Sequence, residues 1–358
     1  MLTMLRVHGT KREVLSMEQH LPQELVSNIL SRLPAKDLVK CKRVCKSWFD
    51  LITDYHFVTN HYVAYNNLMH YQSQEEQLLV IGRPFVSALK THISLLSCNT
   101  NDPQKNHISS SSLLNLPCEY NNSEHKYWSE ISGPCNGIYF LEGNPNVLMN
   151  PSLGQFKALP KPHLSASQGT YSLTEYSGFG FDPKTNDYKV VVIRDIWLKE
   201  TDERKLGHWT AELYSLNSNS WRKLDDASLP LPIEIWGSSK VYTYVNNCCH
   251  WWGYDVDESG AKEDDVLAFD MVNESFKKIK VPRIRGSSKE EFATLAPLKE
   301  SSTIAVVVYP LRGQEKSFDV WDLQVCGKNG SLRAARYMES LVSLKRGNEF
   351  SCQFVSRE

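Results

Sequence analysis

The sequence lacks the features of a secreted or membrane-anchored protein. Its nine cysteines are odd in number and irregularly spaced, so they do not indicate a disulfide framework. The first 17 residues contain no apolar run of the length that a signal peptide needs, and no stretch reaches the roughly 20 consecutive apolar residues of a membrane-spanning helix. We therefore expect the chain to work in the cytoplasm, and also in the nucleus, without attachment to a membrane.

Metal-binding and catalytic patterns are also missing. The pairs Cys41/Cys45 and Cys248/Cys249 lack the two-residue gap and the second ligand pair of a structural zinc site, so reduced, buried thiols are expected. No G-x-S-x-G, H-E-x-x-H or P-loop motif is present, and the adjacent Cys249 and His250 lie in a strand of packing type. The sequence predicts neither an enzyme nor a bound cofactor.

The chain has almost no net charge. The 40 Lys and Arg residues are matched by 41 Asp and Glu residues, a net charge of -1, which does not favour a nucleic-acid partner or a membrane surface. With 358 residues, 41% of them hydrophobic, the chain is long enough for two domains with their own cores.

The N-terminal part has the periodicity of helices. Leu21, Leu25, Ile29 and Leu33 recur every four residues, and Pro34 ends this first helix. A second apolar run follows at Leu38, Cys41, Cys45, Trp48 and Ile52. Helices this short enclose too small a core for strong independent stability, so we expect this surface to rest against a partner as well.

Beyond residue 60 the pattern changes to short β-branched or aromatic runs between turn residues. The polar stretch 99–124 reads as a surface loop. The predicted strands are 137–141, 147–149, 188–193, 209–216, 241–245, 266–269, 304–309 and 318–323.

A short repeat occurs three times in this second region. Each copy begins with a polar residue (Asn150, Ser215, Asp270), and after five residues it continues with an aromatic residue, a cation, any residue and an aliphatic residue. Phe156, Trp221 and Phe276 are the aromatic residues. This order predicts a repeated β-hairpin whose aromatic ring faces a shared interior. The spacing, slightly above the ~50 residues of a kelch blade, favours a propeller-like array, and a two-sheet sandwich is the alternative.

Residues 21–52 resemble an F-box. The matching positions are Leu21, Pro22, Glu24, Leu25, Ile29, Leu30, Arg32, Leu33, Pro34, Lys36, Leu38, Val44, Cys45, Lys46, Trp48, Leu51 and Ile52. The remainder resembles the F-box-associated region of plant F-box proteins. Its landmarks are the segments 133–137, 150–151, 178–182, 186–190, 220–222, 249–251 and 269–270. Within that family the combination is most similar to the S-locus F-box and S-locus F-box-like group.

The resemblance implies an α+β multidomain protein with a small helical F-box and a mainly-β, propeller-like domain. It further implies a non-catalytic substrate receptor that binds a Skp-type adaptor, and through it a cullin, in a ubiquitin ligase. The adaptor-binding positions that it implies are Leu21, Pro22, Leu25, Ile29, Leu33, Leu38, Val44, Cys45 and Trp48. The alternative is an interaction protein without ligase output, or a non-functional copy, because its target-binding domain is incomplete.

The target implied by the S-locus group is a basic ribonuclease. A cluster of acidic residues could steer such a partner from a hairpin tip, and a solvated turn is the simpler interpretation. The candidate target-binding residues are Asp255, Asp257, Glu258, Asp264 and Asp265. The cluster imitates a calcium loop, but Val266 stands where a bidentate Glu is required. A glycan receptor would need an exposed aromatic patch, to which only one of Trp251 and Trp252 could contribute.

These patterns divide the chain into a tail (1–17), a helical domain (18–60), a β domain (61–323) and an atypical C-terminal segment (324–358). The last segment departs from the family pattern, because it contains no further Ser-Trp hairpin and little strand pattern. The sequence therefore leaves open whether the β domain closes.

Overall fold

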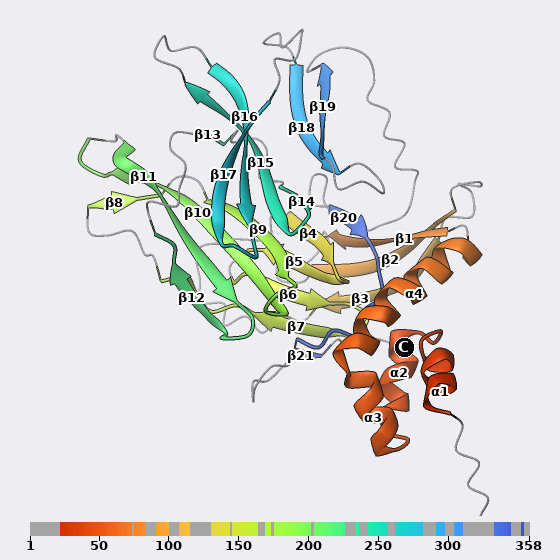
Figure 1. Cartoon of the computed structure of the whole chain (residues 1–358). Coiled ribbons are helices and arrows are strands. Elements are labelled where there is room, and N and C mark those ends of the chain that lie inside the picture. Colours follow the sequence, from red (N-terminus) through yellow and green to blue (C-terminus); the bar gives the residue numbers. More distant parts are fainter. Residues whose placement is uncertain are drawn as a thin grey trace, which may run out of the picture.

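The structure is a computed structural model of the whole chain (Figure 1). The residues that it describes are 22–73, 75–82, 91–99, 107–114, 130–143, 145–163, 169–172, 175–201, 204–225, 234–235, 242–256, 262–281, 291–297, 304–310, 333–344 and 352–353. It has four helices followed by strands in these parts of the chain.

The helical domain consists of α1 (Gln23–Leu30), α2 (Ala35–Cys41), α3 (Lys46–Thr53) and α4 (Tyr55–Ser73). Pro22 and Pro34 are the N-caps of α1 and α2, where a missing N–H costs nothing. Asp54 separates α3 from α4, and its side chain accepts a hydrogen bond from the Phe57 N–H at 3.0 Å. The expected end of the helical domain at residue 60 is therefore wrong, because α4 continues to Ser73.

The buried face of α4 explains why the sequence pattern missed it. Phe57, His61 and Tyr65 are spaced four residues apart, and their rings are stacked along one side of the helix. A helix whose apolar stripe is aromatic and includes a histidine does not show the Leu/Ile periodicity of an ordinary amphipathic helix.

The β domain contains five sheets in the described residues. The first holds β1 (Glu75–Gly82), β2 (Thr91–Asn99), β3 (His107–Leu114) and β20 (Arg333–Arg336), and the second holds β4 (Glu130–Cys135), β5 (Ile138–Glu142), β6 (Val147–Asn150), β7 (Gln155–Ala158) and β21 (Cys352–Gln353).

The other three sheets follow in chain order. The third holds β8 (Thr170–Tyr171), β9 (Glu175–Asp182), β10 (Asp187–Leu198), β11 (Arg204–Ser215) and β12 (Ser220–Lys223). The fourth holds β13 (Glu234–Ile235), β14 (Thr243–Val245), β15 (Cys248–Val256), β16 (Lys262–Asp270) and β17 (Ser275–Lys280). The fifth holds β18 (Glu291–Pro297) and β19 (Ile304–Pro310).

The sheets are arranged one after another around the domain. Neighbouring sheets contact each other through β20 and β4, β4 and β9, β9 and β15, and β14 and β18. Every paired strand is antiparallel to its neighbour, for example β1 to β2 and β10 to β11. This is the propeller-like, mainly-β architecture that the sequence predicts, behind a small helical domain (Figure 1).

The three repeats are hairpins of identical register. Asn150 pairs with Gln155, Ser215 with Ser220, and Asp270 with Ser275. The polar residue closes the four-residue turn with its own side chain: Asp270 Oδ1 accepts the backbone N–H groups of residues 272 and 273 at 2.9 and 3.0 Å.

A fourth hairpin with the same register was not recognised from the sequence. Asp182 pairs with Asp187, and Asp182 Oδ1 accepts the N–H of Lys184 at 2.9 Å. Its aromatic residue is Tyr188, which is buried like Trp221 and Phe276. The rings therefore face the interior, as predicted, and the exposed Arg222 and Lys277 face outwards.

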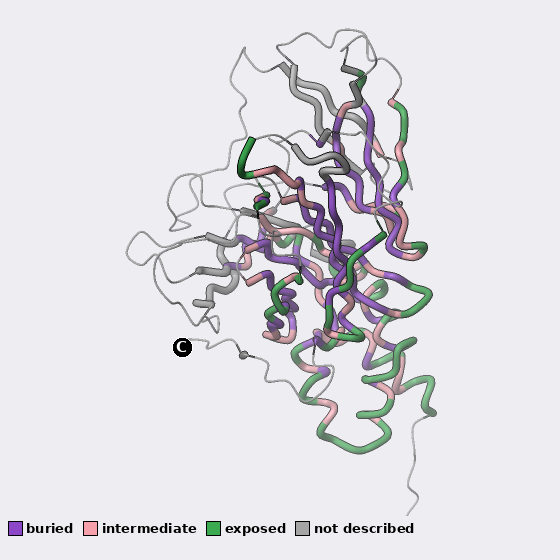
Figure 2. The backbone as a smooth tube through the Cα atoms, turned by 90° about the vertical axis from the view of Figure 1, so that its left-hand side faces the viewer, coloured by how far each residue is buried: buried purple, intermediate pink, exposed green. Residues whose placement is uncertain are grey.

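The largest core runs through the second, third and fourth sheets, and Figure 2 shows buried residues (purple) concentrated within the β domain. Its largest fully buried side chains include Trp251, Tyr188, Tyr214 and Phe269. A separate small core lies among the helices. The two domains therefore have cores of their own.

Two expectations about irregular regions need correction. The segment 99–124 is not only a loop, because it contains strand β3, which pairs with the preceding strand β2. Backbone pairing at a sheet edge does not require apolar side chains, and the Ser-rich sequence of β3 hid the strand. The segment 324–358 is not without strands, because β20 pairs with β1 and β21 pairs with β7. The predicted strand 318–323 lies outside the described residues.

Candidate docking surface on the helical domain

Helix α1 directs its apolar stripe into solvent. The side chains of Leu25 and Ile29 lie one turn apart and are 52% and 54% exposed. The interior is filled instead by Val26 and Leu30 from the other side of the same helix. Exposing two large aliphatic side chains on one short helix is unfavourable in water, which indicates that a partner covers them.

The turn between α2 and α3 extends this surface. Val44 is 63% exposed, and the neighbouring Cys45 is exposed at the N-cap of α3. A hydrogen bond with the Ser47 hydroxyl, at 3.1 Å between Sγ and Oγ, lowers the pKa of the Cys45 thiol. Pro22 is exposed at the start of α1. Four other predicted adaptor-binding positions are also exposed: Leu25, Ile29, Val44 and Cys45.

Other predicted positions belong wholly or partly to the core. Leu38 is 0% exposed and packs against Leu30 and Ile52, so its assignment to the docking surface is wrong. Leu33 and Trp48 are half-buried and pack against the same core. Leu21 lies outside the described residues. The apolar run Leu38, Cys41, Cys45, Trp48 and Ile52 is therefore divided: Leu38 and Ile52 are buried in the helical core, whereas Cys45 is exposed.

Five further large, exposed apolar side chains of the helical domain were missed: Val39, Phe49, Tyr55, Val63 and Met69. Val39 on α2 and Phe49 on α3 are large, exposed side chains among polar neighbours. They stand next to Leu38 and Trp48 in the sequence, on the outward side of their helices. The signal that could have found them is an apolar residue on the face that otherwise carries Lys40 and Lys46.

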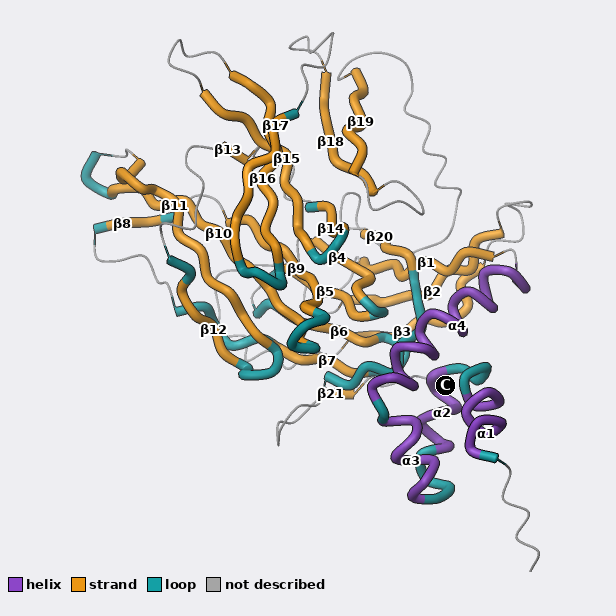
Figure 3. The backbone as a smooth tube through the Cα atoms, in the orientation of Figure 1, coloured by secondary structure: helices purple, strands orange, loops and turns teal. Residues whose placement is uncertain are grey.

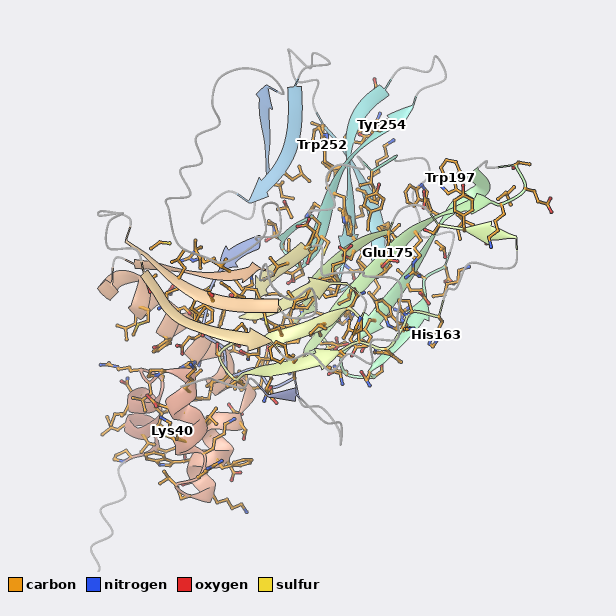
Figure 4. The ribbon with its side chains drawn as sticks, turned by 180° about the vertical axis from the view of Figure 1, so that it is seen from behind. Lys40, His163, Glu175, Trp197, Trp252 and Tyr254 are labelled. Atoms are coloured by element: carbon orange, nitrogen blue, oxygen red, sulfur yellow. The ribbon has the colours of Figure 1, made fainter. Side chains whose placement is uncertain are left out.

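The charged residues around this surface are mostly cationic. Lys40, which Figure 4 labels on the helical domain, pairs with Asp37 at 2.8 Å, and this hydrogen bond raises its pKa. Arg43 and Lys46 are also exposed. Exposed pairs of this kind contribute little to stability.

The second predicted site, the acidic cluster, is only partly at a hairpin tip. Asp255 pairs with Glu263 across β15 and β16, and residues 257–261 between them lie outside the described residues. Asp265 is buried and forms an ion pair with Lys278 at 3.0 Å. Its assignment to a target-binding surface is therefore wrong, because its carboxylate already has a partner inside the sheet.

The two adjacent tryptophans do not form a surface patch. Trp251 and Trp252 are both buried, and the Trp251 indole donates a hydrogen bond to the Ser177 carbonyl at 3.3 Å. Figure 4 shows Trp252 inside the β domain, far from the helices. Neither ring is available to a glycan.

Two kinds of site have no candidate in the part of the chain that the structure describes. No group of three or more His, Cys, Asp or Glu residues is placed to hold a metal ion. Among the same residues, no helix combines the length and apolar character needed to cross a bilayer.

The arrangement defines a class of protein: a small helical module with outward-facing apolar residues, followed by a propeller-like β domain. Residues 19–63 match the family described as F-box-like. Residues 84–342 match the family described as F-box associated beta propeller domain. The chain therefore belongs to the family with an F-box associated beta propeller domain and is a plant F-box protein.

Curated relatives agree with this assignment. An F-box/kelch-repeat protein of Arabidopsis thaliana is 26% identical over 76% of this chain and 68% of its own length. The F-box protein CPR1 of Arabidopsis thaliana is 27% identical over 58% of this chain and 46% of its own length. The chain spans about two thirds or less of the length of these relatives. A solved endo-arabinase from Bacteroides thetaiotaomicron matches with a TM-score of 0.29 and 11% identity, over 66% of this chain and 95% of that one.

Proposed function

We propose that this protein is the substrate-receptor subunit of a Skp-cullin-F-box ubiquitin ligase. The observation that carries the proposal is the exposure of Leu25, Ile29 and Val44 within the segment that matches the F-box. These side chains are arranged as helix-in-groove anchors: two lie one turn apart on α1, and the third lies at the turn that follows α2. The groove would belong to a Skp-type adaptor, which connects the receptor to the cullin.

The role requires no catalytic group from this chain. Docking of α1 would remove the exposed apolar surface from water, which is favourable by about 25 cal/mol for each Å² buried. The exposed Val39 and Phe49 extend the same apolar surface beyond the predicted positions. The β domain would hold the protein to be ubiquitinated, and the complex would work in the cytoplasm and the nucleus.

A finer version of the proposal concerns the target. The resemblance to the S-locus group supports a basic ribonuclease taken up by pollen tubes, in a self-incompatibility reaction. The exposed Glu263, and the acidic residues at positions 255, 257, 258 and 264, would steer such a partner. Asp265 is excluded from this set because it is buried and paired with Lys278.

A pull-down and titration with a Skp-type adaptor tests the general role. Leu25→Asp and Ile29→Asp should each reduce adaptor affinity by at least about 100-fold, since an unpaired carboxylate would enter the apolar contact. Both residues are exposed in the free chain, so its melting temperature should hardly change.

Lys40→Glu is the matched control. Lys40 is exposed on the same domain, and its ammonium forms an ion pair with Asp37. Reversing this charge should therefore change the free energy of adaptor binding by less than about 1 kcal/mol. Undiminished adaptor binding by Leu25→Asp would refute the docking surface. Adaptor binding without ubiquitination of any co-purified protein would favour the alternative, an interaction protein without ligase output.

A further inference from the structure

Residues 337–344, here called the interdomain segment, connect the two domains. They follow β20 without forming a helix or strand, and Figure 3 shows this loop running from β20 alongside α4. The segment contributes to all three cores: Tyr337 belongs to the core of the first two sheets, Leu341 to the helical core, and Leu344 to the large β core. Eight residues thus touch both domains.

An asparagine of the helical domain holds one side of this segment. Asn66 on α4 donates a hydrogen bond from Nδ2 to the Glu339 carbonyl at 3.0 Å and accepts one on Oδ1 from the Glu339 N–H at 2.9 Å. The Glu339 carboxylate in turn accepts a hydrogen bond from the Ala35 N–H at 2.7 Å, at the start of α2. One residue of the segment is therefore bonded to two helices.

An asparagine of the β domain holds the other side. Asn150 is fully buried, and its Nδ2 donates to the carbonyls of Ser340 at 3.1 Å and Val342 at 2.8 Å. Its Oδ1 closes the β6–β7 turn by accepting the N–H of Ser152 at 2.9 Å. The equivalent positions of the other hairpins are Asp182, Ser215 and Asp270, which close their turns with an acceptor alone.

This difference explains the amide at position 150. Turn closure needs only an oxygen, which a carboxylate or a hydroxyl also supplies. Only asparagine among the four adds two N–H donors, and both of them are used on the interdomain segment. The segment also covers the Asn136-Gly137 turn so closely that a Cβ on Gly137 would lie 2.9 Å from the Met338 carbonyl oxygen.

We propose that Asn66 and Asn150 are positioning residues that fix the angle between the β domain and the helical domain through the interdomain segment. The inference rests on the proposed function. If the β domain holds a target for ubiquitination, a fixed angle between the domains would present that target to the ubiquitin-loaded enzyme from one direction. Neither asparagine belongs to the exposed apolar surface of α1 and α3.

Two substitutions test this in the full-length chain. Asn150→Asp and Asn66→Asp keep the acceptor oxygen and the size of the side chain but place a carboxylate against carbonyl oxygens in place of the donors. In the double variant we expect amide hydrogen exchange of residues 337–344 to become about tenfold faster or more. Small-angle scattering should show a larger radius of gyration, because the domains would sample several angles.

The matched control is Asp270→Asn. It makes the reverse exchange at the equivalent turn position of the β16–β17 hairpin, where the side-chain hydrogen bonds of Asp270 stay within its own hairpin, and should leave the scattering profile unchanged. If the double variant loses its fold, Leu341→Ala removes the helical-core contact alone, and Leu344→Ala removes the β-core contact. Each should increase the radius of gyration while the near-ultraviolet circular dichroism of the β domain persists.

Scattering identical to that of the wild type, in variants whose segment exchanges faster, would overturn the proposal. Unchanged exchange of the segment would overturn it as well. Adaptor affinity separates this result from the proposed function: it should stay within about twofold of the wild type in the double variant. A wild-type chain that binds no adaptor would refute the proposed function, while the scattering comparison would still decide the role of the segment.

Discussion

The two domains place their large apolar side chains in opposite ways. Among the described residues, eight of the nine large hydrophobic side chains that are exposed belong to the helical domain, and Ile279 alone belongs to the β domain. The helical core is small, whereas the main β core runs through three sheets. The difference teaches that the helical domain leaves on its surface the kind of side chain that the β domain buries for its own stability, as expected if the proposed adaptor covers that surface.

Truncating a repeat aromatic should produce the largest effect. Trp221 is buried between sheet strands, and its indole donates a hydrogen bond to the Pro160 carbonyl at 2.7 Å. Trp221→Ala should cost about 3–5 kcal/mol of unfolding free energy, measured by urea denaturation. Ile279→Ala, at the exposed position of β17, should cost less than about 0.5 kcal/mol. If Trp221→Ala and Ile279→Ala lowered the unfolding free energy equally, the contrast between buried and exposed positions in this domain would be wrong.

Within the helical domain, one pair of substitutions should separate folding from docking. Leu38→Ala should cost about 2–5 kcal/mol of stability, because its side chain is wholly buried. Val44→Ala should leave the melting temperature almost unchanged and weaken adaptor binding by roughly tenfold. Thermal melts together with adaptor titration measure both quantities. Loss of stability in Val44→Ala would show that this surface also supports the fold.

A smaller effect is expected in the acidic region. Asp265→Asn should cost about 1–3 kcal/mol, because it removes the buried carboxylate that pairs with Lys278. Glu263→Gln, at an exposed position two residues earlier on β16, should cost less than about 0.5 kcal/mol. If a basic ribonuclease binds, Glu263→Gln should slow its association and flatten its salt dependence. An unchanged association rate in surface plasmon resonance would separate the acidic residues from target binding.

The smallest effect concerns pH. His61 is buried in the helical domain, where burial lowers its pKa, while the contact of Nε2 with the Leu33 carbonyl at 2.8 Å opposes that shift. The neutral ring is favoured in the folded state, so its contribution to stability is full above the unfolded pKa of about 6.5 and is lost as the pH falls towards the lower folded value. Urea denaturation between pH 7.5 and 5.5 should show this loss.

His61→Gln is the control: glutamine does not titrate, so the slope should become shallower, and the buried His250, whose pKa burial also lowers, should account for part of the remainder. Glu339 acts in the opposite direction: burial raises its pKa, so its contribution is full below the ordinary value of 4.5 and is lost as the pH rises through the folded value. If unfolding free energy depends on pH as steeply in His61→Gln as in the wild type, the pH dependence belongs to other groups.

The sequence was most informative where one pattern decided both structure and position. The order of polar residue, turn, aromatic residue and cation predicted three hairpins and the inward direction of their rings, and in the structure the three hairpins share one register. Local turn chemistry fixes a register, because a one-residue shift would move every side chain to the other face. The F-box segment was recognised for the same reason, since its preferences are dense over a short stretch.

What the sequence could not supply depends on contacts between distant residues. Whether Leu38 or Val39 faces a partner is decided by the tertiary arrangement of α2, because both are apolar neighbours on one short helix. The packing of residues 337–344 has no local pattern at all: it depends on Asn66 and Asn150, far away in the chain. An amide that joins two distant segments, as Asn150 does, is indistinguishable in the sequence from an amide that only closes a turn.

The pairing of β20 with β1 has a consequence for how the protein is made. Leu78 lies opposite Arg336, so strands from the two ends of the β domain complete one sheet. During synthesis the first sheet waits for its fourth strand until residues 333–336 have left the ribosome, and the second sheet waits for β21, whereas sheets three to five can form before either. Contacts of such long sequence separation form slowly. A premature stop before residue 333 would therefore leave the edge of β1 exposed beside the helices, where unpaired strands invite aggregation.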